Sequence, residues 1–161
     1  MPGTFKGRIA PSIEPGAQLI ITGKVFEADC HTLAAGVTVY SYHTDANGFY
    51  RFDHYMPDWQ SRRPRLEGTV RTGADGMYEF QTIRPAPYPE HNNPAHVHFV
   101  LWWPDGHRQG DIAYFVGDPL LGPSQFRQNA STLNFSSIQH VITDGNMQRL
   151  HLDFHKHEQE D

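Results

Sequence analysis

Residues 94–106 read PAHVHFVLWWPDG, and this stretch decides the fold. Its central part, 96–103, is strongly apolar, and the Pro-Asp-Gly that follows is a turn signal. A run of eight residues closed by a turn is typical of a buried β-strand rather than a helix. We therefore expect a core strand here.

The same rhythm of short strand and turn continues on both sides of this stretch. Turn sequences occur at 45–48 (DANG) and 73–76 (GADG), with glycine where a positive φ is expected. Further strands are predicted at 19–26, 36–42, 67–72, 77–83, 112–116 and 149–154. Residues 123–133 have room for one or two helical turns. The spacing predicts an all-β protein, an antiparallel β-sandwich.

The length of 161 residues suits a single small domain. We expect an N-terminal extension over 1–15, the β-sandwich over 16–154 and a charged tail over 155–161. The first ten residues lack the apolar centre of a signal peptide. No apolar run approaches the roughly 20 residues that cross a membrane.

Composition narrows the function classes. The net charge of −5 does not predict a nucleic-acid surface, and we expect no membrane partner. Cys30 is the single cysteine, so no internal disulfide can form, which fits a reducing compartment such as the cytoplasm. Eleven histidines make a metal site worth seeking.

His96 and His98 are the first candidates for metal ligands. Residues i and i+2 of a strand share a face, so the two imidazoles point the same way. The alternative is a sheet face that carries two histidines by chance, but unpaired imidazoles on a core strand are costly. Tyr88 lies eight residues upstream between Pro87 and Pro89, which fix its backbone.

The donor types favour one kind of metal. Imidazole suits zinc, copper, iron and nickel, whereas phenolate oxygen favours a hard, highly charged ion. Two tyrosinates and one hydroxide would balance the charge of iron(III). Zinc sites prefer thiolate, imidazole and carboxylate. A cupin would need a glutamate shortly after the second histidine, and 100–103 has none.

At this point the chain resembles the intradiol ring-cleavage dioxygenases, which include catechol 1,2- and protocatechuate 3,4-dioxygenases. Tyr50 looks like the family's first tyrosine ligand, Tyr88 its second, and His96 and His98 its histidine pair. The resemblance runs from about residue 16 to residue 119 and rests on the segments 19–25, 35–39, 47–50, 72–78, 80–89, 94–99 and 116–119.

The resemblance implies a non-haem iron(III) enzyme. It would bind a catechol-type diol through both oxygens and, with O2, cleave the ring between the two hydroxyl-bearing carbons. The implied metal ligands are Tyr50, Tyr88, His96 and His98. One tyrosine would leave the metal as the diol binds and act as a base, so Tyr50 and Tyr88 are also the catalytic candidates, with Tyr55 as a rival to Tyr50. The expected partners are the diol and O2, and the chain can form a homo-oligomer.

Two positions depart from the family pattern. Asn93 stands where the family usually has arginine, and Ile112 stands where it usually has glutamine. Both family residues normally stabilise charge on the substrate ring. The candidate replacements are Arg62, Arg63, Arg65 and Arg108.

Two alternatives stay open. The first is a non-catalytic β-sandwich binding module of the transthyretin-like or carboxypeptidase-regulatory kind, which shares the strand and turn patterns. The second keeps the iron but catalyses a different reaction, because of Asn93 and Ile112. Tyr88 together with His96 and His98 favours the enzyme, since a binding module has no reason to assemble them.

Overall fold

The computed structural model describes residues 4–51, 64–89, 94–118, 120 and 134–157. Within these ranges all regular structure is β-strand, which confirms the predicted all-β class. The strands are β1 (Lys6–Arg8), β2 (Gln18–Phe26), β3 (Thr38–His43), β4 (Glu67–Arg71), β5 (Met77–Ile83), β6 (His96–Trp102), β7 (Arg108–Phe115), β8 (Asn134–Gln139), β9 (Val141–Asp144), β10 (Met147–His151) and β11 (Phe154–His155).

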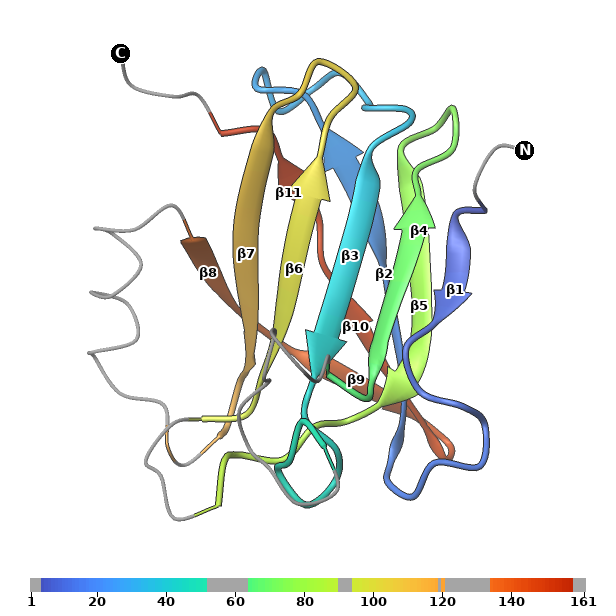
Figure 1. Cartoon of the computed structure of the whole chain (residues 1–161), viewed down its shortest axis with the longest axis vertical. Helices are drawn as coiled ribbons and strands as arrows, with labels where there is room; N and C mark the ends of the chain where they lie inside the picture. The colour runs from blue at the N-terminus through green and yellow to red at the C-terminus, as the bar shows by residue number, and fades with distance from the viewer. Residues whose placement is uncertain (1–3, 52–63, 90–93, 119, 121–133, 158–161) are drawn as a thin grey trace.

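The strands form two sheets, which lie one behind the other in Figure 1. The first has the order β1-β5-β2-β10-β9, with β11 also paired to β2, and the second has the order β4-β3-β6-β7-β8. The expected antiparallel pairing holds for the central strands of the second sheet. Four other pairs, β1/β5, β10/β2, β11/β2 and β7/β8, are parallel, so both sheets are mixed. Alternation in a sequence reports which face is buried and not the direction of the neighbouring strand.

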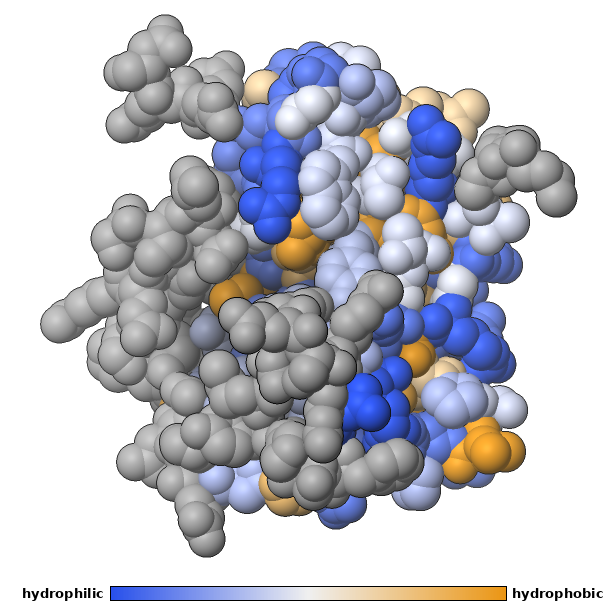
Figure 2. All heavy atoms as spheres, in the orientation of Figure 1, coloured by the Kyte–Doolittle hydropathy of each residue, from blue (hydrophilic) through white to orange (hydrophobic). Residues whose placement is uncertain are grey.

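Side chains from both sheets meet in one hydrophobic cluster. Val97, Phe99 and Leu101 of β6 are buried in it, and the Phe99 ring lies 5.0 Å from that of Phe154 on β11. The intervening residues of β6 point to the opposite face of the second sheet. That face is turned toward the viewer in Figures 1 and 2, where polar and apolar residues are interspersed.

The predicted strands recur with shifted ends. The strand expected at 112–116 begins at Arg108, and the one expected at 149–154 divides into β10 and β11. The strands β1, β8 and β9 were not predicted. β1 lies within the expected N-terminal extension. The two residues before it contact both sheets, since the backbone N–H of Glu79 donates to the Phe5 carbonyl and that of Arg71 to the Thr4 carbonyl. The domain boundaries stay predictions, and residues 123–133 lie outside the described ranges.

Among the described residues, no helix has the length and apolar character that a membrane crossing requires.

Candidate metal centre

His96 and His98 lie on β6 and point to the outer face of the second sheet, as strand alternation predicts. Their rings meet edge to face at a centroid distance of 4.6 Å, with the two Nε2 atoms 3.0 Å apart. The Nδ1 atom of His96 lies 2.8 Å from the Pro94 carbonyl, which can only accept a hydrogen bond. In neutral His96 the proton is therefore on Nδ1, and the Nε2 lone pair faces His98.

Two tyrosine oxygens complete a closed ring of four donor atoms. The Tyr50 oxygen lies 2.6 Å from that of Tyr88 and 3.0 Å from His98 Nε2. The Tyr88 oxygen lies 3.0 Å from His96 Nε2. Metal–ligand bonds of about 2.0–2.1 Å at near-right angles put neighbouring ligand atoms roughly 3 Å apart. The spacing within the ring therefore fits one metal ion.

Tyrosine is needed for any such site. Within the described ranges, no three histidine, cysteine, aspartate or glutamate side chains gather so that they can hold a metal ion. The donor set is two imidazole nitrogens and two phenol oxygens, so two of its members can become anions. That chemistry fits a hard trivalent cation better than zinc.

Burial keeps His96, His98 and Tyr50 neutral in the absence of a cation. It lowers the pKa of His98 to about 3, and the adjacent His96 adds to the effect. Burial also lowers the pKa of His96, against the bond to the Pro94 carbonyl. The pKa of Tyr50 is raised far above that of a free phenol, first by burial and then by Tyr88. Neutral imidazole is the form that binds metal, and a bound cation would reverse the shift on the phenols.

Tyr50 follows the tight turn at 45–49. The phenol is 2% exposed, so the turn delivers it into the interior of the site. Gly48 has a φ of +88°, and a Cβ at that position would lie 2.0 Å from the Pro87 carbonyl oxygen. Only glycine combines this backbone conformation with so close an approach. The tyrosine-bearing turn therefore rests directly on the loop that carries Tyr88.

Aromatic and apolar side chains surround the ring of donors. Tyr42 on β3 stacks on His98, with centroids 4.5 Å apart and planes within 8°. Burial raises the pKa of Tyr42 to about 12, so it stays a phenol. The contact follows from the register of β3 on β6, which places Tyr42 opposite His98. Ile112 on β7 pairs directly with His98, so its side chain lies on the same face of the sheet.

The arginines weighed as replacements for the family's cation lie elsewhere or outside the described ranges. Arg108 pairs with Trp102, four residues along β6 from His98 and thus roughly 13 Å away. The Arg65 guanidinium is bonded to Glu14 and Asp45. Asn93, Tyr55, Arg62 and Arg63 lie outside the described ranges.

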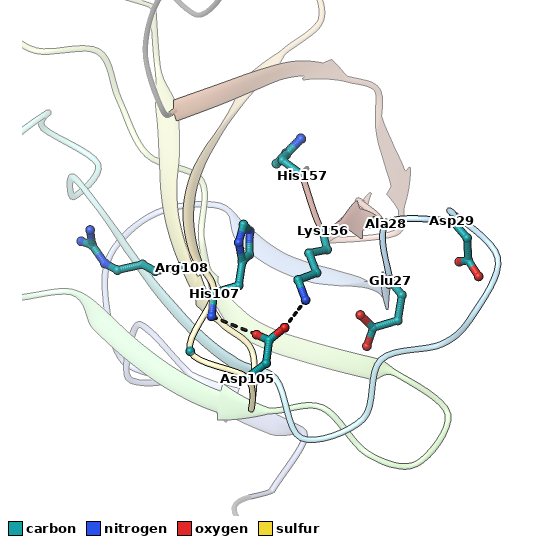
Figure 3. A pocket seen from close by; sticks show the side chains of 9 residues that line it. Glu27, Ala28, Asp29, Asp105, His107, Arg108, Lys156 and His157 are labelled. Carbon is teal, nitrogen blue, oxygen red and sulfur yellow. Dashed lines mark hydrogen bonds and ion pairs between the residues drawn. The ribbon is translucent and has the colours of Figure 1, made fainter. Parts of the chain in front are cut away.

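A pocket of about 920 Å³ lies at the other end of β6, around the β6–β7 turn (Figure 3). Its lining is mostly charged, and Asp105 is paired with Lys156 across it. None of the four ring residues lines this pocket. It is therefore separate from the candidate metal centre.

Comparison with known proteins identifies the family of the chain. Residues 6–155 match the family described as Dioxygenase. The chain is 33% identical over 135 residues to catechol 1,2-dioxygenase 1 of Acinetobacter lwoffii, covering 74% of this chain and 42% of that protein. It is 32% identical over 115 residues to the protocatechuate 3,4-dioxygenase beta chain of Burkholderia cepacia, covering 66% and 48%. The chain thus spans less than half the length of these relatives.

Solved structures share the fold. Catechol 1,2-dioxygenase from Pseudomonas arvilla C-1 superimposes with a TM-score of 0.71 at 22% identity, covering 95% of this chain and 57% of that one. The dioxygenase domain of a carbohydrate-binding fusion protein from Streptomyces sp. SirexAA-E superimposes with a TM-score of 0.69 at 24% identity, covering 96% of this chain and 87% of that one. With residues 6–155 matched to the family, the chain belongs to the intradiol ring-cleavage dioxygenases, a family that uses non-haem iron.

Proposed function

We propose that this protein is an iron(III)-dependent intradiol dioxygenase with a β-sandwich fold. It would bind a catechol-type diol and, with O2, open the ring between the two hydroxyl-bearing carbons. The single observation that carries the proposal is the closed ring of Tyr50, Tyr88, His96 and His98 donor atoms, spaced at 2.6–3.0 Å. Membership of the family supports it.

When bound, iron(III) would act as a Lewis acid and as a template that holds the diol through its oxygens. His96 and His98 supply neutral lone pairs, since burial disfavours their protonated forms. The hydrogen bond from His96 Nδ1 to the Pro94 carbonyl keeps the other nitrogen free for the metal.

The two tyrosines have different surroundings, and we assign them different roles. Tyr50 is almost fully buried, whereas Tyr88 is half-buried at the end of a loop. Tyr88 would therefore be the side chain with room to move and to accept a proton from the diol. A general base in this position needs proximity more than strength. Tyr50, beside it, would remain a fixed ligand.

The wall beside His98 is apolar at Ile112, where the family pattern would supply an amide. An isoleucine cannot stabilise charge on the substrate ring, so this site favours larger or less polar diols than catechol. That substitution also favours the second candidate, an iron(III) enzyme of the same fold with an altered reaction. A balanced intradiol cleavage puts both atoms of O2 into one ring-opened dicarboxylic acid.

The test is oxygen uptake by iron-loaded protein with catechol, protocatechuate, hydroxyquinol and bulkier diols, followed by product analysis with ¹⁸O2. The proposal expects a dicarboxylic acid that carries both labelled atoms. His98→Ala removes a metal ligand and should abolish turnover. His151→Ala is the matched control, because that histidine is exposed on β10 and paired with Asp153. Binding of diols without oxygen uptake would contradict the proposal and favour a binding module, and a different product would favour altered chemistry.

A further inference from the structure

The Asp45 carboxylate organises the turn that delivers Tyr50. Its Oδ1 atom accepts the backbone N–H of Asn47 at 2.9 Å and that of Phe49 at 3.1 Å. The Asp45 backbone joins the same turn, because its N–H donates to the Phe49 carbonyl at 2.8 Å and its own carbonyl accepts from Gly48 at 3.0 Å. The aspartate thus fixes the backbone on both sides of the turn immediately before Tyr50.

The same residue holds the loop that carries Tyr88. The Asp45 carbonyl accepts the N–H of Ala86 at 3.1 Å, and the neighbouring Thr44 hydroxyl donates to the Ala86 carbonyl at 2.7 Å. Gly48 lies against the Pro87 carbonyl. We call these contacts between 44–48 and 86–87 the loop junction. Tyr88 follows the junction by one residue, so the orientation of the turn sets where its phenol lies.

Arg65 holds the second oxygen of the Asp45 carboxylate. The Oδ2 atom accepts from the Arg65 guanidinium at 3.2 Å, and the same guanidinium is paired with Glu14. Both carboxylate side chains are only 8% exposed, and a buried carboxylate requires such a partner. The Arg65 backbone N–H also donates to the Tyr50 carbonyl at 2.8 Å, so this arginine holds both the Asp45 carboxylate and the backbone of the tyrosine that follows the turn.

We propose that Asp45 is a positioning residue that sets the separation of the Tyr50 and Tyr88 phenols, and with it the affinity of the metal centre. This inference rests on the proposed function only where it concerns iron. The carboxylate does not touch the donor atoms. It acts through the turn at 45–49 and the loop junction. These contacts link the turn before Tyr50 to the loop before Tyr88, and the strands that precede the turn and the loop, β3 and β5, are not paired with each other.

An ordinary turn aspartate provides the matched comparison. Asp75 occupies the other turn of similar sequence, and its Oδ1 accepts the Met77 N–H at 3.1 Å. That turn precedes β5, and among the described residues its hydrogen bonds do not reach residues 84–88. Asp75→Ala therefore removes the same kind of bond without reaching the loop junction.

The first arm of the experiment needs no metal. Amide hydrogen exchange is measured on the metal-free protein, comparing Ala86, whose N–H donates to Asp45, with Arg84, whose N–H donates to Ala17. Asp45→Ala should speed exchange at Ala86 at least about tenfold while Arg84 changes little. Asp45→Asn keeps the acceptor oxygen for the turn and should restore most of the protection. Asp75→Ala should leave both amides unchanged.

The second arm is iron(III) affinity and the visible spectrum. Asp45→Ala should weaken affinity by about 10- to 100-fold, as loss of a group behind the ligands does, and shift the tyrosinate band. Where Asp45→Ala fails to fold, Thr44→Val loosens the same junction and should reproduce the Ala86 effect. The inference is overturned if Asp45→Ala or Thr44→Val behaves like Asp75→Ala in both arms. Absence of an iron band in the wild type would instead contradict the proposed function, and the exchange arm would still decide the role of Asp45.

Discussion

The phenol oxygens of Tyr50 and Tyr88 lie 2.6 Å apart, although 38 positions of sequence separate them. At that distance one phenol donates a hydrogen bond to the other, and two phenolates could not remain so close without a cation between or beside them. Burial already disfavours ionisation of Tyr50. The pair is thus arranged for a positively charged ligand.

Tyr88→Phe should shift or bleach the visible band of the iron-loaded protein, because one of the two anionic oxygens is lost. Tyr78→Phe is the matched control, since the Tyr78 hydroxyl is buried and donates to the Leu152 carbonyl at 2.6 Å, away from the metal centre. It should cost about 1–3 kcal/mol of unfolding free energy and leave the spectrum alone. Absorption spectra and urea unfolding check both. Equal spectra for wild type and Tyr88→Phe would remove Tyr88 from the ligand set.

Gly48→Ala should destabilise the protein more than Gly106→Ala. Both glycines have a φ near +90°, so alanine is strained at each by about 1–3 kcal/mol. A Cβ on Gly48 also meets the Pro87 carbonyl, whereas one on Gly106 meets no atom within 4 Å. The additional overlap should add at least about 1 kcal/mol and lower iron affinity. Thermal and urea unfolding measure the difference, and equal losses would show that the turn and the loop do not press together.

The free energy of unfolding of the metal-free protein should fall as the pH is lowered, and protonation of His43 should account for part of the fall. This side chain is fully buried between the Thr44 carbonyl and the Thr82 hydroxyl, and burial lowers its pKa from 6.5 to about 4. Between pH 6.5 and pH 4 the unfolded chain therefore binds a proton at His43 that the folded protein does not bind. The contribution of this group to the free energy of unfolding is full above pH 6.5 and declines toward pH 4. The decline due to this group is on the order of 3 kcal/mol.

Urea unfolding between pH 7 and pH 4 measures that decline. His43→Gln should be less stable at pH 7 but should flatten the profile, leaving the slope contributed by His96 and His98. An unchanged slope in His43→Gln would show that His43 does not govern acid sensitivity.

Ile112→Gln should raise turnover of plain catechol. The side chain at 112 lies beside His98, and an amide there can donate a hydrogen bond to charge on the ring. In other enzymes, loss of one such donor lowers turnover by about 100- to 1000-fold, so regaining one here should raise turnover of catechol by about tenfold or more. Ile142→Gln, on an isoleucine that is 66% exposed, is the control. Fast wild-type turnover of catechol, equal to that of bulky diols, would show that this position has little influence on the reaction.

Local pattern was enough to predict the strand that carries the histidines. Apolar alternation over Val97, Phe99 and Leu101 predicted both a core strand and a shared face for His96 and His98. Short exposed strands such as β9 lack that alternation and were missed. The parallel pairing of β10 with β2 was also unpredictable, because the direction of a neighbouring strand depends on the chain's path between the sheets.

The candidate site divides in the same way. Motif resemblance brought Tyr50 and Tyr88 into consideration, and the proline-flanked loop gave Tyr88 some independent support. The stacking of Tyr42 on His98 depends on strand register, and the bonds of Asp45 to its own turn and to Ala86 depend on turn geometry. Spacing along the chain encodes neither. The DANG sequence predicted a turn at Asp45, but it could not predict the hydrogen bond between the Asp45 carbonyl and the Ala86 N–H.

The metal centre is tested most directly by the metal content and visible spectrum of the protein purified after loading with iron(III). Two tyrosinates on iron(III) absorb visible light, so we predict one iron per chain and a red to burgundy protein. Resonance Raman excitation in that band should enhance tyrosinate ring modes, and these should weaken in Tyr50→Phe and in Tyr88→Phe. Stoichiometric zinc with no visible band, or iron whose spectrum is unchanged in both variants, would contradict iron(III) ligation by Tyr50 and Tyr88.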